Sequence, residues 1–167
     1  NREGGLGSAS LDLVDGLMVG ALVAVNSVGS VYMPDGETFW AQPFSYGDEI
    51  GGQRPNPNQE PVMQPIPDDA KLKGMTPGTN TTIGIIATSA KLTTAECKRI
   101  AMMAQDGYAR AIRPVHTLSD GDTIFCISGG TKEIPDGPAR SSWLSEIGSA
   151  AADTMARAIA RGVYEAQ

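Results

Sequence analysis

Histidine and cysteine are scarce: the sequence has one histidine, His116, and two cysteines, Cys97 and Cys126. A histidine-based triad or zinc site would have to rest on His116 alone, without a second histidine or a G-x-S-x-G motif. The two cysteines lack metal-ligand spacing and provide no disulfide framework. We therefore expect no metal and no cofactor, and we interpret His116 as a structural residue that orients the turn before Asp120.

Positive charge and long hydrophobic runs are also scarce. Thirteen Lys and Arg residues stand against 19 Asp and Glu, and the net charge is −6. Because no cationic cluster is present, we expect neither a nucleic acid nor a membrane surface as a partner. The longest apolar run, Leu17 to Val25, is too short to cross a bilayer. The chain begins at Asn1, so we expect upstream residues to be missing; we expect a cytoplasmic protein, with a periplasmic or secreted one left open.

The first part of the chain has strand patterns followed by a long loop. At 167 residues and 41% apolar content, the chain suits one globular domain. Leu17 to Val25 is apolar throughout, so a strand here would be apolar on both faces, which predicts a central strand between two layers. Val28 to Met33, a Pro34-Asp35-Gly36 turn and Thr38 to Trp40 predict a second strand and a hairpin. From Gln42 to Gly78, prolines and polar residues predict an exposed loop or processing linker.

The second part alternates strands and helices. Thr82 to Thr88 predicts a buried strand, and Thr93 with Glu96 forms a capping box for a helix that ends near Arg110. A short strand is expected at residues 123–128, after Asp120-Gly121-Asp122, and a helix at 142–164 has small residues suited to packing on a sheet. The predicted fold class is mixed α/β (α+β).

The junction between linker and strand is a candidate for chemistry. If the Thr81 hydroxyl attacks the Asn80 carbonyl, an N-to-O acyl shift gives an ester that water hydrolyses. Thr81 then carries a free α-amine with an ordinary pKa of about 8, which can take the proton of its own hydroxyl. On the local residues alone, the start of a strand is the more common interpretation of Thr81 and Thr82.

Three further polar residues could serve such a nucleophile. Asp120 and Asp122 could hydrogen-bond the Thr81 ammonium and hydroxyl, although an ordinary Asp-Gly turn is the common local alternative. A calcium loop at this pair is excluded because the required glycine and final glutamate are absent. Asn26 could donate its amide to an oxyanion, or could simply form a turn. Gly4 and Gly5 lack the lysine of a phosphate loop and suit close backbone approach.

The ordered set of motifs resembles one family, the L-aminopeptidase/D-esterase family, which includes β-peptidyl aminopeptidases and nylon-oligomer hydrolases. The motifs are Gly4-Gly5-Leu6-Gly7-Ser8-Ala9-Ser10, Val25-Asn26-Ser27-Val28-Gly29, Asn80-Thr81-Thr82-Ile83-Gly84, Arg113-Pro114-Val115-His116-Thr117 and Asp120-Gly121-Asp122-Thr123. The resemblance covers nearly the whole chain except the Pro-rich linker. Each motif is weak alone, and their co-occurrence overrides the local alternatives.

The resemblance implies a four-layer α-β-β-α sandwich like that of N-terminal-nucleophile hydrolases, of which this chain is the C-terminal part. Residues 1–80, with the linker at 42–79, would end the α chain of the precursor, and residues 81–167 would form the β chain after autocleavage between Asn80 and Thr81. Thr81 would be the nucleophile and Asn26 an oxyanion donor, while Asp120 and Asp122 would position the amine. Gly4 and Gly5 would line the substrate site.

The resemblance further implies a small peptide or amide substrate, the missing N-terminal part of the precursor as a partner, and a homo-oligomer, commonly a tetramer. One departure is that many relatives have Lys before the paired glycines, where this chain has Arg2-Glu3. Two alternatives to a self-processing aminopeptidase or amidase stay open. One is an acyltransferase of the ornithine acetyltransferase type, and the other is a paralogue that has lost catalysis.

Overall fold

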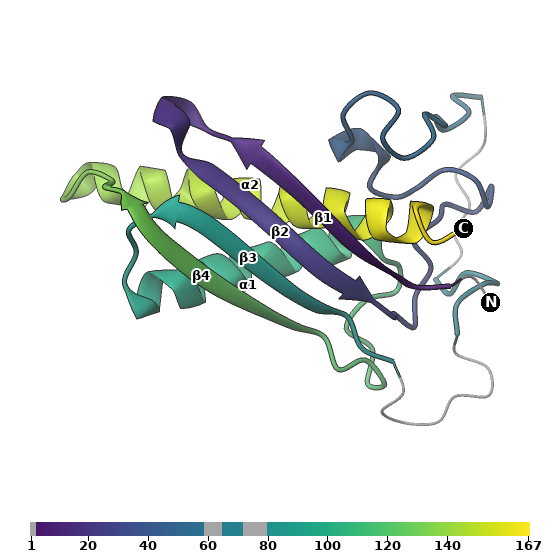
Figure 1. The fold of residues 1–167 in the computed structure, drawn as a ribbon. Coiled ribbons are helices and arrows are strands. Elements are labelled where there is room, and N and C mark those ends of the chain that lie inside the picture. Colours follow the sequence, from purple (N-terminus) through teal and green to yellow (C-terminus); the bar gives the residue numbers. More distant parts are fainter. Residues whose placement is uncertain (1–2, 59–64, 72–79) are drawn as a thin grey trace.

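The computed structural model describes residues 3–58, 65–71 and 80–167, and these form one sheet with two helices (Figure 1). The elements are β1 (Gly5–Asp12), β2 (Met18–Val25), β3 (Ile83–Ala90), α1 (Thr94–Ala111), β4 (Thr123–Lys132) and α2 (Pro138–Tyr164), with 3-10 turns at Val14–Gly16 and Gln42–Phe44. The strand order is β1-β2-β3-β4. β2 is antiparallel to β1 and β3, whereas β4 is parallel to β3 and is reached through α1.

Most of the predicted elements are confirmed. β2 is a central strand, and the strands expected at 82–88 and 123–128 are β3 and the longer β4. Both halves of the capping box at the start of α1 are formed by Thr93 and Glu96. The second helix begins at Pro138, earlier than expected, because proline is accommodated at the first helical position.

Two predictions about the first third of the chain were wrong or incomplete. The expected hairpin is confirmed only as a minimal one: Tyr32 and Phe39 form an isolated antiparallel bridge, the Met33 amide donates to the Thr38 carbonyl oxygen at 2.7 Å and the Trp40 amide to that of Val31 at 3.0 Å. The expected second strand does not form, because the ladder ends there and Ser30 pairs with Arg113 instead. β1 was not predicted, since glycine disfavours strands. The described part of the 42–79 linker has no helix or strand apart from the 3-10 turn, and positions 59–64 and 72–79 lie outside the described residues.

Both helices cover the same face of the sheet (Figure 1). The contact between α2 and β1 is close enough to require glycine: a Cβ on Gly7 would lie 1.9 Å from the Ala158 carbonyl oxygen, and one on Gly5 would lie 1.8 Å from that of Gly162. The core between helices and sheet contains fully buried Ile86, Ile100 and other apolar residues. Among the described residues, neither helix has the length and apolar content needed to span a membrane.

The opposite face of the sheet is apolar and exposed. Its large side chains are 48–70% exposed and come from all four strands: Leu6, Met18, Leu22, Ile83, Phe125 and Ile127. β2 is apolar on both faces, as expected of a strand between two layers, but the described residues cover only one of these faces. A contiguous apolar surface of this kind is typical of a site that another layer covers.

Candidate active site

The ends of three strands converge around Thr81. The end of β2 lies beside the start of β3 because the two are antiparallel, and the start of β4 lies there because it is parallel to β3. The pairing of β3 with β4 extends beyond both strands through a parallel bridge between Asn80 and Asp120. The topology therefore gathers Asn26, Asn80, Thr81 and the acidic pair at one end of the sheet, and these are the site residues that the sequence predicted.

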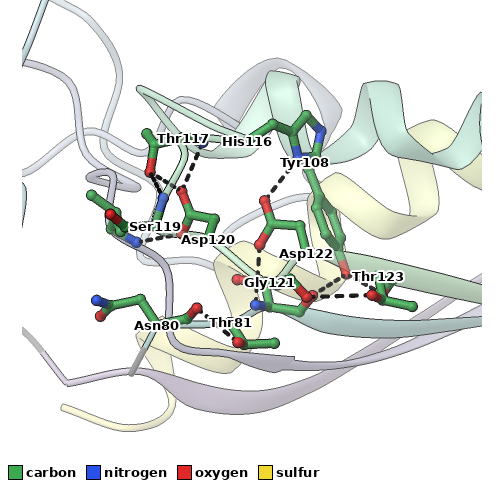
Figure 2. Close-up of polar contacts among 12 residues, drawn as sticks. Asn80, Thr81, Tyr108, His116, Thr117, Ser119, Asp120, Gly121, Asp122 and Thr123 are labelled. Carbon is green, nitrogen blue, oxygen red and sulfur yellow. Dashed lines mark hydrogen bonds and ion pairs between the residues drawn. The ribbon is translucent and has the colours of Figure 1, made fainter. Parts of the chain in front are cut away.

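Thr81 is held by its backbone and by its hydroxyl. Its amide donates to the Asn26 carbonyl oxygen at 2.9 Å. Its hydroxyl donates to the carbonyl oxygen of Asn80 at 2.7 Å, across the peptide bond that precedes it (Figure 2). The hydroxyl of the neighbouring Thr82 is fully buried and has no hydrogen-bond partner among the described residues. Of the two adjacent threonines, only Thr81 is partly exposed and has its hydroxyl in contact with a peptide carbonyl.

Asp120 fixes the turn on one side of Thr81. Its Oδ1 accepts a hydrogen bond from the Val28 amide at 3.0 Å, in the segment that follows β2. Its Oδ2 accepts from the amide and the hydroxyl of Thr117, at 3.0 and 2.8 Å. The carboxylate thereby joins two loops that are distant in sequence.

Asp122 fixes the other side (Figure 2). Its Oδ1 accepts from the Thr82 amide at 3.1 Å, and its Oδ2 lies 2.8 Å from His116 Nδ1. His116 has a left-handed backbone, with φ of 54°, which turns its ring toward the carboxylate. Neither carboxylate has a hydrogen bond to Thr81 among the described contacts: Asp122 holds the adjacent Thr82, and Asp120 holds Val28 and Thr117 in the surrounding loops. The interpretation of His116 as a residue that orients this turn agrees with its contact.

Asn26 lies one residue beyond β2 with an exposed side chain. Lys71 Nζ donates to its Oδ1 at 2.9 Å, and the Lys71 amide is itself anchored by the Val28 carbonyl at 2.8 Å. An ammonium on the amide oxygen fixes which way the Asn26 side chain is turned and polarises its NH₂ group as a donor. No sequence pattern indicated Lys71, because it lies in a loop without periodic apolar residues.

Tyr108 connects the two strands that carry the site residues. It projects from α1, is fully buried, and its hydroxyl lies 3.1 Å from the Thr82 carbonyl oxygen and 3.2 Å from that of Thr123. Burial, and secondly the neighbouring Asp122 carboxylate, raises the pKa of this hydroxyl well above its usual range, so it stays protonated as a donor. Tyr108 was not identified from the sequence as a site residue, because its contacts with the Thr82 and Thr123 carbonyl oxygens join segments that are distant along the chain.

The paired glycines have a packing role in the described structure. A Cβ on Gly4 would lie 1.8 Å from the Val25 carbonyl oxygen, so Gly4 lets the start of β1 approach the end of β2. Gly4 and Glu3 also line a small cavity that includes Lys71. Gly5 packs on α2. The expectation that the paired glycines allow close backbone approach is confirmed. Contact of these glycines with a substrate stays a prediction. Arg2, which precedes them with Glu3, lies outside the described residues.

These residues are chemically suited to reactions of hydroxyl groups with carbonyls. Among the described residues, no group of three or more His, Cys, Asp or Glu side chains could hold a metal ion. The potential donors at the site are instead the Asn26 amide, backbone amides and the Lys71 ammonium, beside the Thr81 hydroxyl. Groups of this kind stabilise negative charge that develops on a carbonyl oxygen.

Known proteins with similar sequence or structure point to one family. The family model for peptidase family S58 matches residues 1–167. An uncharacterized aminopeptidase of Mycobacterium leprae is 42% identical over 172 residues, which cover 99% of this chain and 45% of that protein. A 6-aminohexanoate-oligomer endohydrolase of Kocuria sp. is 29% identical over 86 residues, or 52% of this chain and 24% of that protein.

The fold also matches solved structures. The L-aminopeptidase D-Ala-esterase/amidase of Ochrobactrum anthropi, described as a new variant among the Ntn hydrolase fold, superposes with a TM-score of 0.55 at 19% identity, covering 96% of this chain and 40% of that one. This likeness shows the fold, and the expected N-terminal-nucleophile-like architecture is confirmed. The chain spans less than half the length of these relatives. The family expected from the sequence is confirmed as well: the chain belongs to peptidase family S58.

Proposed function

We propose that this chain is the nucleophile-bearing part of a self-processing amide hydrolase, an aminopeptidase or amidase, in which Thr81 is both the cleavage nucleophile and the catalytic one. The observation that carries the proposal is the 2.7 Å hydrogen bond from the Thr81 hydroxyl to the Asn80 carbonyl oxygen, at the strand edge where Asn26, Asp120 and Asp122 meet. Cleavage between Asn80 and Thr81 would divide the chain into residues 1–80 and 81–167.

Self-processing begins with the hydroxyl oxygen of Thr81 bonding to the Asn80 carbonyl carbon. The carbon–nitrogen bond breaks, the hydroxyl proton is transferred to the departing nitrogen, and an ester links the two residues. Water then hydrolyses the ester, which leaves a carboxylate on Asn80 and restores the Thr81 hydroxyl. The new α-amine has an ordinary pKa of about 8 and is partly neutral at pH 7.

Hydrolysis of a substrate repeats the same chemistry. The α-amine accepts the hydroxyl proton, Thr81 Oγ1 attacks the substrate amide, and the amine product departs after it receives that proton. Water activated by the same α-amine releases the acyl group. Asn26, turned by Lys71, donates to the oxyanion. Asp122 positions Thr81 by holding the amide of the adjacent Thr82, and Asp120 positions the turn beside it by joining the Val28 and Thr117 segments.

The substrates we propose are small peptides or peptide-like oligomers, cleaved near a free amino terminus. The names of the relatives support this class, since they include an aminopeptidase and a hydrolase of 6-aminohexanoate oligomers. The test is the hydrolysis of aminoacyl amides and 6-aminohexanoate oligomers by the full-length protein, beside its Thr81→Ala variant. Acyl transfer to ornithine without hydrolysis would replace the proposal with the acyltransferase alternative, and a cut protein without either activity would contradict it.

The exposed sheet face supports a further part of the proposal, namely that an N-terminal part of the same precursor covers it with a second sheet. The six large apolar side chains on this face are 48–70% exposed, and the relatives are more than twice as long as the part that this chain matches. Burying such a surface stabilises by about 25 cal/mol per Å². We expect residues 1–167 alone to bind a hydrophobic dye at this face, and the longer protein to bind far less.

A further inference from the structure

We infer that Gly121 is a positioning residue and backbone donor for self-cleavage: its amide polarises the scissile Asn80 carbonyl, and its missing side chain makes room for the Thr81 hydroxyl. The inference deepens the proposed function and rests on it. Gly121 lies between Asp120 and Asp122, faces Thr81 in the structure, and has no role in the steps derived above (Figure 2).

The first observation is a hydrogen bond. The Gly121 amide donates to the Asn80 carbonyl oxygen at 3.1 Å, and the Thr81 hydroxyl donates to the same oxygen at 2.7 Å. When the hydroxyl oxygen attacks, it ceases to be a donor, and the carbonyl oxygen gains negative charge. The Gly121 amide is then already in place to stabilise that charge.

The second observation concerns space. A Cβ built on Gly121 would lie 2.7 Å from Thr81 Oγ1, closer than real Cβ contacts allow, but 3.5 Å from Thr81 Cγ2 and 3.6 Å from Thr81 Cβ. The collision is thus with the reacting oxygen alone. Gly121 does not have a left-handed backbone, so alanine fits its backbone conformation, and the side chain that must move is the Thr81 hydroxyl.

The acidic pair explains why Gly121 stays in place. Asp120 is tied to Val28 and Thr117, and Asp122 to Thr82 and His116. The residues on both sides of Gly121 are therefore fixed, and the glycine cannot retreat to admit a larger side chain. These carboxylates act on the cleavage by holding the Gly121 amide against the scissile carbonyl.

The direct test is the rate of cleavage of the full-length protein with Gly121→Ala, followed by intact mass. We expect cleavage before residue 81 to slow by at least about 100-fold, the effect of displacing a reacting atom by about 1 Å. The matched control is Gly20→Ala in β2, where the nearest atom of the described residues to the added Cβ is 3.8 Å away, and which we expect to be cut at the normal rate.

The outcomes separate this inference from the proposed function. If wild type is cut, Thr81→Ala is not, and Gly121→Ala is cut at the normal rate, the proposed function stands and the Gly121 inference is overturned. If wild type is never cut before residue 81, both are overturned.

Two measurements on uncut protein do not depend on the cleavage rate. In Thr81→Val, whose methyl group occupies the position of the hydroxyl, Gly121→Ala should lower the unfolding temperature, whereas in Thr81→Ala it should not. If Gly121→Ala changes the unfolding temperature equally in both backgrounds, the inference that Gly121 makes room for the Thr81 hydroxyl is overturned. In uncut Thr81→Ala, the Gly121 amide should be protected from hydrogen exchange, and fast exchange would overturn its role as donor.

Discussion

Substitution of Asp122 tests whether the acidic pair acts through position or through charge. The carboxylate is 5% exposed and accepts from the Thr82 amide at 3.1 Å, with His116 Nδ1 2.8 Å from its other oxygen. Asp122→Ala leaves a backbone donor without its acceptor, and we expect a loss of about 1–3 kcal/mol of unfolding free energy. Asp122→Asn keeps an oxygen for the Thr82 amide and presents an NH₂ group to the imidazole, which can accept in its other tautomer.

We therefore expect Asp122→Asn to lose less than about 1 kcal/mol and to be cut within about tenfold of the wild-type rate. Asp122→Ala should be cut about 100-fold more slowly, because Thr81 shifts relative to the Asn80 carbonyl. Stability is measured by urea unfolding in the Thr81→Ala background, so that all proteins compared are uncut. If Asn is as damaging as Ala to both stability and cleavage, the charge of Asp122 matters and the positional account is refuted.

Three further predictions follow from other contacts. Hydrogen bonds from Arg140 lower the pKa of Glu96 from 4.5 to about 2, so this contribution to stability is complete above pH 4.5 and disappears as the pH falls toward 2. Glu96→Gln should cost about 1 kcal/mol of unfolding free energy at pH 7, after allowance for solvent screening. The gap to wild type in thermal unfolding should close near pH 2, and a constant gap would contradict this. Lys71→Met should lower kcat about tenfold through loss of the charged donor to Asn26, while Lys71→Arg should keep most of it; equal kcat values in both variants would exclude an orienting role. Gly7→Ala should destabilise by about 1–3 kcal/mol in urea, because the added methyl group forces β1 and α2 apart; an unchanged midpoint would contradict that packing.

The sequence predicted the elements that have strong local signals. The continuous apolar run of β2 and the Thr93–Glu96 capping box specify their own structures through burial and hydrogen bonding. β1 was missed because its stability comes from contact with α2, where Gly5 and Gly7 are an advantage rather than a defect. The expected hairpin is only a minimal one around Tyr32 and Phe39, because the residues before it, Val28 and Ser30, bond to Lys71 and Arg113 in distant parts of the chain.

The candidate site was predicted in its members but not in its contacts. The ordered motifs identified Asn26, Thr81 and the acidic pair, and the topology brings them together. The carboxylates were expected to contact Thr81, yet in the described structure Asp122 holds the adjacent Thr82 and Asp120 holds the loops of Val28 and Thr117. Lys71 could not be found from the sequence, because its contact with Asn26 joins residues that are separated by a loop and has no local pattern.

The measurement that tests the central claim most directly is the intact mass of the purified full-length protein beside that of its Thr81→Ala variant. The account predicts two chains for the wild type, the second beginning at Thr81, and one uncut chain for the variant. A wild type that remains a single chain, or a variant that is still cut before residue 81, would contradict it.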